Sequence, residues 1–425
     1  MHNFDLRILG DADSGYRVEV TASPAGETPQ AIPMPSPLDR PVVETAVHDL
    51  RDFRADPSTV RDLGSALWQV LFQPPIAGRY AQSLGIAGDA GLRIRLRIDP
   101  AALQSLPWEY LHNPETAQFL ALARRTPLVR YVARPQPIPP LEVDLPLRLL
   151  VLISAPTDQP ALQVDRERTL IEDALGPMIE TGAVELTVET DGRPDRLQDR
   201  LRQGFHVLHY IGHGIMMREQ GHLVLEDDTG ESWFVGASAL EPLLGDTDLR
   251  CVVLTACESA TAPGDPFLGL APALVRGGIP AVVAMQMSMP DESAVIFTRE
   301  FYRSLAHRWP VDACVTEGRL GIRAAVRDTR IDWGIPALFM RSDDGIIFAP
   351  DDAEEADQSD LAFDTRELEA KSRSGGIDIT GSTVIIEGDV AGRDMIKTNV
   401  GHTGETDEST DVVSTLRRAI RRLFG

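Results

Sequence analysis

Cysteine is scarce in this chain, with three residues in 425. Cys251, Cys257 and Cys314 are odd in number, and their spacing fits neither a disulfide framework nor a zinc site. The amino terminus lacks a basic-then-apolar leader, and no apolar run approaches the length of a membrane-spanning helix. These absences predict a soluble protein of the reducing cytoplasm, with no metal centre and no membrane anchor.

Basic residues are also fewer than acidic residues in this chain. The chain has 41 Lys and Arg residues against 64 Asp and Glu residues, which gives a formal net charge of −23. Because the neutralisation of phosphates requires clustered basic side chains, this balance argues against a nucleic-acid partner. The sequence has neither a Walker-type glycine loop nor a dinucleotide fingerprint, so neither ATP nor NAD is implied and we expect no cofactor.

Two apolar stretches of strand length stand in the middle of the chain, at Phe205–Ile211 and Leu249–Thr255. Both run into small residues, which is typical of buried parallel strands that reach the edge of a sheet. The first leads to His213 and the second to Cys257. Because ligands of open α/β sheets bind outside the carboxyl ends of the strands, neighbouring strands of this kind would bring imidazole and thiol to one crevice.

A paired thiol and imidazole have a defined chemistry. The imidazole raises the thiolate fraction of the cysteine and can protonate a leaving amine. Gly214 lets a substrate carbonyl approach the backbone, so the N–H groups of Gly214 and Cys257 are candidate oxyanion donors. His213 precedes Cys257 by 44 residues, close to the spacing of about 50 in caspase-type sites. The alternative is structural, because buried cysteines and core histidines are common.

Several motifs in order resemble the CHAT domain, a family of peptidases related to caspases and separases. They are Ile211–Gly214, Val252–Ala260, Ala273–Met285 and Phe301–Leu305, with Leu106–Leu111 upstream. The resemblance covers roughly residues 90–350. It implies a caspase-like fold and a cysteine endopeptidase in which Cys257 is the nucleophile and His213 the base and then the acid. The sequence around Cys257, Thr-Ala-Cys-Glu-Ser, departs from the caspase pattern.

The same resemblance suggests how a substrate would be chosen. Metacaspase-type relatives place an acid two residues before the nucleophile, where this chain has Thr255. Asp291 aligns with an aspartate of separase-like and CHAT enzymes, and a buried carboxylate there would select Arg or Lys. Asp291 could instead only cap a helix at 292–307. Glu258, directly after the nucleophile, either orients the substrate groove or is solvated.

Composition divides the chain into four parts. Residues 1–140 are predicted to be a mainly β module, and residues 145–350 the caspase-like peptidase domain. Residues 351–375 contain nine acids against three bases and are predicted to be a disordered linker. Residues 376–425 are predicted to form short β strands and a basic amphipathic helix that serves in assembly or recruitment.

Within the first part, alternation at 1–22 predicts a hairpin, and helices are expected at 41–53 and 58–74. Leu92–Ile98 alternates strictly, which predicts a half-exposed strand with a solvated arginine face. A short helix is expected from Asp99 to Leu111, with Asp99 as its cap and Trp108 in the core.

The second part repeats a strand-then-helix order, which predicts a doubly wound α/β/α sandwich with a mostly parallel sheet. Further strands are expected at Leu147–Ser154, Val184–Glu189 and Ala281–Met287, and further helices at 161–181 and 194–203. Asp228-Thr-Gly between two β-type runs predicts an antiparallel hairpin.

The resemblance and the tail together suggest a biological setting. The segment after Gly376 resembles short appendages of bacterial conflict proteins, which recruit or assemble effectors. We therefore expect a peptidase of bacterial immunity, antiviral defence or programmed cell death that cleaves a protein substrate. A sensor or effector would bind the C-terminal segment, and the chain could form a homo-oligomer. The alternative is a catalytically silent caspase-like adaptor that works through the same segment.

Overall fold

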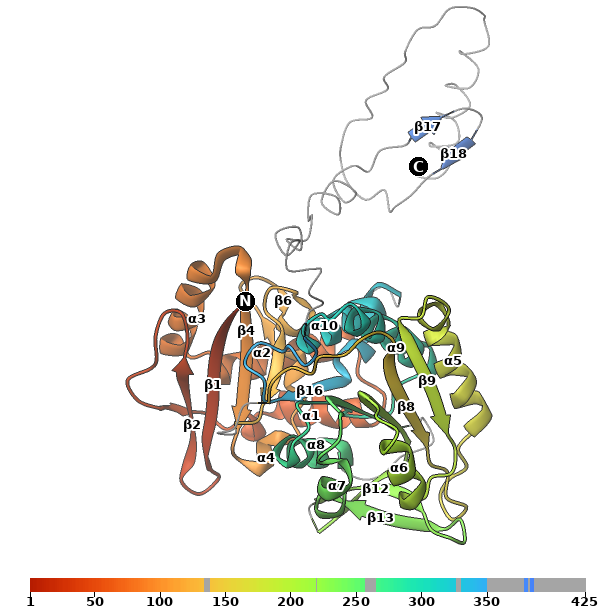
Figure 1. The fold of residues 1–425 in the computed structure, drawn as a ribbon. Coiled ribbons are helices and arrows are strands. Elements are labelled where there is room, and N and C mark those ends of the chain that lie inside the picture. The colour runs from red at the N-terminus through yellow and green to blue at the C-terminus, as the bar shows by residue number, and fades with distance from the viewer. Residues whose placement is uncertain are drawn as a thin grey trace, which may run out of the picture. The chain divides into compact units, whose positions relative to one another are not determined.

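One large sheet organises the chain (Figure 1). The computed structural model describes residues 1–133, 138–218, 220–256, 265–325 and 330–349, and two strands further on. In these residues eleven strands pair in the order β3-β2-β1-β4-β7-β16-β15-β14-β10-β8-β9. They are β1 (His2–Asp11), β2 (Gly15–Ala22), β3 (Ile32–Met34), β4 (Leu92–Ile98), β7 (Leu128–Tyr131), β8 (Leu147–Ile153), β9 (Val184–Glu189), β10 (Val207–Gly212), β14 (Cys251–Ala256), β15 (Ala281–Met285) and β16 (Pro336–Met340).

Nine of the eleven strands form two parallel blocks that run in opposite directions, and β2 and β3 are joined to them by antiparallel pairing. Strands β15, β14, β10, β8 and β9 are parallel, and β16 pairs antiparallel with β15. Strands β7, β4 and β1 run parallel to β16. The carboxyl ends of β10, β14 and β15 therefore lie at one edge of the sheet, and those of β4 and β7 lie at the opposite edge.

Ten α-helices of the described chain accompany the sheet. They are α1 (Pro41–Arg51), α2 (Pro57–Leu71), α3 (Pro74–Ala87), α4 (Ala101–Gln104), α5 (Val164–Glu180), α6 (Pro194–Leu201), α7 (Ala237–Leu244), α8 (Pro266–Gly277), α9 (Asp291–Ala306) and α10 (Val311–Ala325). The predicted helices at 41–53 and 58–74 correspond to α1 and α2. The sequence analysis did not identify α3.

Alternate residues of the central strands face two separate cores. Leu149 and Val151 pack in one core with residues of α5, α9 and α10. Leu150 and Leu152 pack in the other with residues of α6, α7 and α8. Because successive side chains of a strand point to opposite faces, helices cover both sides of the sheet. The predicted α/β/α sandwich with a mostly parallel sheet is confirmed.

Three short strands extend from the end of β10. They are β11 (Gly214–Met217), β12 (Gln220–Glu226) and β13 (Ser232–Gly236), paired antiparallel in that order. The predicted hairpin around Asp228 is the connection between β12 and β13. Two further pairs are β5 (His112–Asn113) with β6 (Gln118–Phe119), and β17 (Asp378–Thr380) with β18 (Thr383–Ile385).

Some of the four parts expected from composition lie partly or wholly outside the described residues. Contact density separates a unit of residues 1–353 from one of residues 354–425. The predicted linker at 351–375 and the predicted C-terminal amphipathic helix lie outside the described residues, as does the proline-rich connector at 134–137. The predicted boundary at residues 140–145 stays a prediction, and strands from both sides of it join the large sheet.

The prediction of a solvated arginine face on β4 is wrong. The side chains of Arg93 and Arg95 are 3% and 8% exposed. Arg93 donates to the carboxylate of Asp312 at 2.7 and 3.1 Å, and Arg95 donates to Asp5 at 2.6 Å. These guanidinium groups are buried because distant carboxylates neutralise them.

The predicted helix cap at Asp99 is also wrong. Helix α4 starts after Pro100 without a side-chain cap. The Asp99 carboxylate instead accepts hydrogen bonds from Arg7 and Arg97, each at 2.8 Å. The prediction that Trp108 belongs to the core is confirmed, since this side chain is fully buried and donates to the Leu103 carbonyl.

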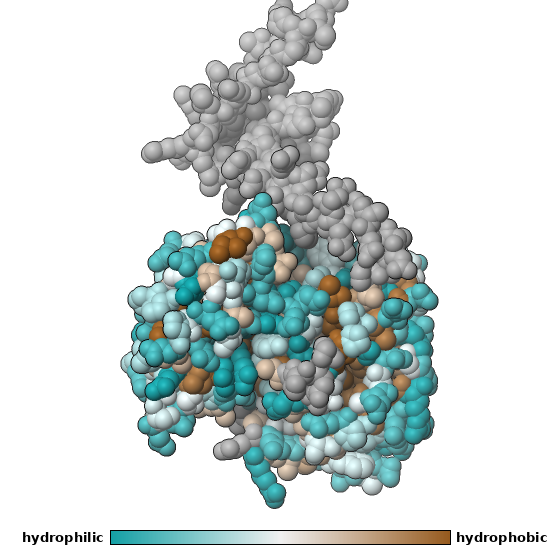
Figure 2. Space-filling model, turned by 60° about the vertical axis from the view of Figure 1, so that its left-hand side comes forward, coloured by the Kyte–Doolittle hydropathy of each residue, from teal (hydrophilic) through white to brown (hydrophobic). Residues whose placement is uncertain are grey.

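The surface offers no single large apolar region in the view of Figure 2, where hydrophobic side chains form separate patches on a hydrophilic background. Exposed large hydrophobic residues such as Phe53, Ile86 and Trp233 lie far apart in the sequence, after α1, in α3 and in β13 respectively. Among the described helices, none combines the length and the apolar character that a membrane crossing requires.

The buried pair of Arg93 and Asp312 is expected to be a major contribution to stability. Asp312→Ala leaves Arg93 in the interior without its carboxylate, so the free energy of unfolding should fall by about 3–5 kcal/mol in urea denaturation. Glu317→Ala on the same helix is the control, because its partner Arg124 is 43% exposed and such pairs contribute about 1 kcal/mol or less. Equal losses in the two variants would contradict the prediction.

Candidate active site

The strand order reverses between β8 and β10, because β8 connects to β9 on one side and β10 connects to β14 on the other. Helix α5 follows β8 and packs in one core, whereas α7 lies between β10 and β14 and packs in the other. The chain therefore leaves β8 and β10 on opposite faces of the sheet. In open α/β sheets such a topological switch point is where ligands bind. His213 comes directly after β10, at this point.

His213 is 5% exposed. Its carbonyl oxygen accepts hydrogen bonds from the Tyr210 hydroxyl at 2.9 Å and the Val224 amide at 3.0 Å, which fixes the backbone. Within the described part of the chain, neither ring nitrogen has a hydrogen-bond partner. Burial lowers the pKa of the imidazole below its ordinary value of 6.5. The side chain is thus neutral at pH 7 and can accept a proton.

The pairing of β10 with β14 determines how the carboxyl ends of the two strands align. The register runs from Val207 opposite Cys251 to Gly212 opposite Ala256. His213 follows Gly212, and Cys257 follows Ala256. The predicted nucleophile Cys257 and its neighbour Glu258 lie outside the described residues. The two strands that lead to the predicted dyad are therefore adjacent, parallel and in register at their last residues.

Gly214 begins β11 in a specific orientation. It stands opposite Leu223, while the preceding His213 carbonyl accepts from Val224 of β12. Because amides alternate in direction along an antiparallel strand, the Gly214 N–H points away from β12. A Cβ at this position would lie 2.8 Å from side-chain atoms of Pro266 and Phe267, so close packing against the start of α8 requires glycine.

A small cavity of about 30 Å³ brings two of the predicted substrate-binding residues together. Thr255 of β14 and Asp291 at the start of α9 both line it, together with Ile211 of β10. Ile211 and Thr255 are paired in register, two residues before His213 and Cys257 respectively. The cavity therefore adjoins the ends of the two strands that lead to the predicted dyad.

His209 also lines this cavity. Its Nε2 lies 2.9 Å from the Thr255 hydroxyl, and its Nδ1 lies 3.2 Å from the Tyr302 hydroxyl. Burial lowers the pKa of this imidazole to about 3, so it is neutral at any pH near 7. His209 holds the Thr255 side chain in place and belongs to the core.

The Asp291 carboxylate does not act as a helix cap. Asp291 is the first residue of α9, and the N-cap position is Pro290, with no side-chain cap hydrogen bond. The carboxylate forms an ion pair with Arg166 in the first turn of α5. No sequence pattern indicates this partner, because Arg166 lies 125 positions earlier, among other charged residues.

The sequence analysis did not assign the buried cluster of Glu109, Arg130 and Gln286. Arg130 donates to Glu109 at 2.8 and 2.6 Å and to the Gln286 side chain at 3.1 Å. Gln286 also donates to Glu109 at 2.8 Å. Gln286 follows β15 directly, and the segment after it leads to Asp291. The cluster thus links the Leu106–Leu111 motif to the segment that carries Asp291.

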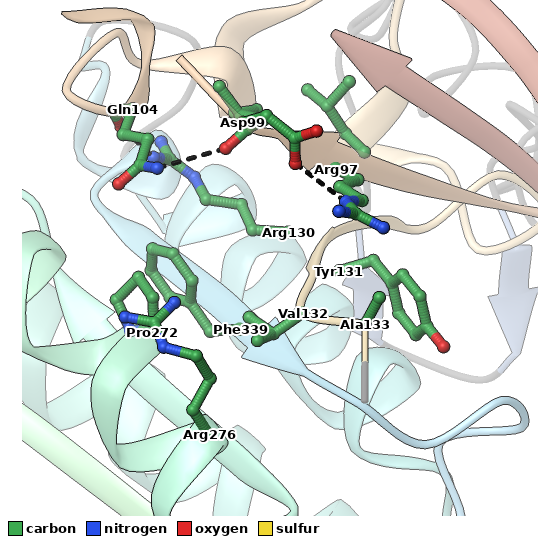
Figure 3. Close-up of a pocket in the computed structure, with 12 residues that line it drawn as sticks. Arg97, Asp99, Gln104, Arg130, Tyr131, Val132, Ala133, Pro272, Arg276 and Phe339 are labelled. Atoms are coloured by element: carbon green, nitrogen blue, oxygen red, sulfur yellow. Dashed lines mark hydrogen bonds and ion pairs between the residues drawn. The ribbon is translucent and has the colours of Figure 1, made fainter. Parts of the chain in front are cut away.

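A larger cavity, of about 200 Å³, lies elsewhere (Figure 3). Arg97, Asp99 and Gln104 on one side and Arg276 on the other point toward it. It is at the carboxyl ends of β4 and β7, at the sheet edge opposite to His213. Size alone therefore does not identify the candidate active site. Among the described residues, no group of three or more His, Cys, Asp or Glu could hold a metal ion.

A family model described as the CHAT domain matches residues 61–344. Because this match covers more than half of the chain, the protein belongs to the CHAT domain family. No curated protein matches the chain significantly. The resemblance expected from the sequence motifs is thereby confirmed.

Three solved structures are similar at low identity. Separase in the Saccharomyces cerevisiae separase–securin complex is 15% identical, with a TM-score of 0.34, and the alignment covers 59% of this chain and 15% of that chain. The Arg-specific cysteine proteinase gingipain R is 13% identical, with a TM-score of 0.39, covering 72% and 76%. RgpB in the Porphyromonas gingivalis complex of pro- and mature domains is 11% identical, with a TM-score of 0.39, covering 68% and 70%. All three TM-scores lie below 0.5.

The buried state of His209 predicts a pH-dependent stability. Its folded pKa is lowered to about 3, whereas the unfolded chain binds a proton near pH 6.5. The stability is therefore fully present above pH 6.5 and is lost as the pH falls toward 3. His209→Gln should reduce the slope of unfolding free energy against pH, measured by urea denaturation between pH 5 and 6, by about 1.4 kcal/mol per unit.

Thr255→Val is the control for that measurement. It removes the hydrogen bond to His209 but keeps the titrating imidazole, so the stability should fall while the slope is retained. An unchanged slope in His209→Gln would contradict the assignment of a buried neutral imidazole.

Proposed function

We propose that this protein is a cysteine endopeptidase that cleaves a protein substrate with Cys257 as nucleophile and His213 as base. The observation that carries the proposal is the buried His213 ring, which has no hydrogen-bond partner among the described residues. An unsatisfied buried polar group costs about 1–3 kcal/mol, so such a ring calls for a partner. Cys257 directly follows Ala256, the last residue of β14, which pairs with Gly212 of β10.

The reaction proceeds in two stages. His213 takes the thiol proton of Cys257, and the sulfur bonds to the substrate carbonyl carbon. The imidazolium then protonates the leaving amine as the C–N bond breaks, which leaves a thioester on Cys257. Water attacks this thioester with His213 again as base, which releases the carboxylic acid and restores the thiol.

The oxyanion that forms in each stage needs preorganised donors. The Gly214 N–H points away from β12, which supports the proposal that it is one of these donors. The Cys257 N–H is proposed as the second donor, and Glu258 as a residue beside the substrate groove. Backbone donors of this kind require no reorganisation during the reaction.

Substrate choice is proposed to depend on the cavity beside Thr255. The Asp291 carboxylate lines this cavity and would form a charge-assisted pair with an Arg or Lys side chain before the scissile bond. The pairing of Asp291 with Arg166 supports this role, because it shows that the carboxylate binds a guanidinium.

The biological setting is also a proposal. The C-terminal residues resemble appendages of bacterial conflict proteins, which supports a cytoplasmic role in bacterial immunity or programmed cell death. In that setting a sensor or effector partner would bind residues 376–425, and self-assembly into an oligomer would use the same segment.

The dyad is tested by cleavage of a mixed peptide library. The wild-type chain should cleave peptides, and Cys257→Ala and His213→Ala should each lose nearly all activity. Because burial lowers the pKa of His213, the acid limb of kcat/KM should have its midpoint below pH 6.5. Cleavage that persists in Cys257→Ala would overturn the mechanism, and no cleavage with or without a partner would favour the adaptor.

The specificity pocket is tested with Asp291→Ala. Cleavage after Arg and Lys should fall by at least about tenfold, since a charge-assisted pair contributes about 1.5–3 kcal/mol. Cleavage after a neutral residue should change little. An equal loss on all peptides would show that Asp291 supports the structure rather than the choice of substrate.

A further inference from the structure

The carboxylate proposed to recognise substrate already has a guanidinium partner within the chain. Arg166, in the first turn of α5, forms an ion pair with Asp291, in the first turn of α9. The Arg166 side chain is 55% exposed and that of Asp291 is 24% exposed. Both side chains are thus in contact with solvent, and Asp291 also lines the small cavity.

The cavity behind the pair is too small for a basic side chain. Its volume of about 30 Å³ would hold about two water molecules, whereas an arginine brings a three-carbon stem and a planar head. Two helices line the cavity. Glu167, Leu170 and Ile171 come from α5, and Asp291, Ala294, Val295 and Thr298 come from α9. An arginine that binds at Asp291 therefore takes the place of Arg166 at the end of α5 and does not fill the cavity as it stands.

We infer that Arg166 is a specificity-determining residue that competes, as an internal guanidinium, with the substrate's basic side chain for Asp291. This inference rests on the proposed function. A basic substrate side chain replaces Arg166 at the carboxylate, and the first turn of α5 shifts with the released arginine. A neutral side chain offers Asp291 no equivalent partner. The pair of Arg166 with Asp291 is then retained and hinders the entry of that side chain.

The ion pair of Arg166 with Asp291 is weak enough to be replaced by one between Asp291 and a substrate side chain. Partly exposed ion pairs are weak because solvent screens them and both side chains lose freedom. A substrate guanidinium that enters the cavity is more fully desolvated and can form two parallel hydrogen bonds to the carboxylate. The exchange therefore favours an arginine or lysine substrate, at the cost of a modest rise in KM.

The kinetic test uses the full chain and two peptides that differ only in having Arg or Gln before the scissile bond. Arg166→Ala should lower KM for the Arg peptide by about two- to fivefold with kcat unchanged. The Gln peptide should be unaffected. Arg168→Ala is the matched control, since Arg168 is on the same helix, 54% exposed, and pairs with Glu172. Arg166→Ala should have no effect on KM when Asp291→Ala is also present.

A binding test does not require cleavage. Agmatine, a small guanidinium compound, is titrated into the Cys257→Ala chain by calorimetry. Its Kd should tighten about two- to fivefold in Arg166→Ala and binding should be lost in Asp291→Ala. If agmatine behaves in this way but no peptide is cleaved, the proposed peptidase fails and the pocket inference stands. If cleavage depends on Cys257 and His213 but Arg166→Ala changes neither KM nor agmatine affinity, the inference is overturned alone.

Discussion

The in-register pairing of β10 with β14 is the constraint on which the candidate site depends. Each strand is buried on both faces, so a slip of one residue would place polar groups in an apolar core. The register that avoids this ends with Gly212 opposite Ala256. It thereby aligns the last residues of the two strands. The position of His213 is a consequence of core packing rather than of any contact made by its own side chain.

A second constraint comes from the amino-terminal half of the chain. The Glu109 and Arg130 side chains are 1% and 3% exposed, and Gln286 hydrogen-bonds both. Buried charges of this kind persist only when every group has partners. The segment that follows β15 is therefore held from one side by Gln286 and from the other by α9. The amino-terminal strands support the candidate site through this cluster, although they lie outside the β8–β15 block.

Sequence patterns identified those features of the fold that depend on residues close together in the sequence. Apolar runs with small residues at their ends located β10 and β14, and the strand-then-helix order predicted the layers. Partners distant in sequence were not predictable, because alternation says which face a residue is on but not what covers that face. Arg93 was expected in solvent, yet Asp312, 219 positions away, buries it in an ion pair. The pairing of Arg166 with Asp291 is a contact of the same kind between two helices.

Ion pairs of two kinds serve different needs in this molecule. A buried pair such as Arg130 with Glu109 is costly to break, because either partner alone would be a charge in the interior. Such pairs fix the geometry of the framework. The pair of Arg166 with Asp291 is partly exposed, so breaking it leaves both groups in contact with water. A carboxylate that must release one guanidinium to bind another can use only the second kind, since a fully buried partner could not be displaced by a substrate.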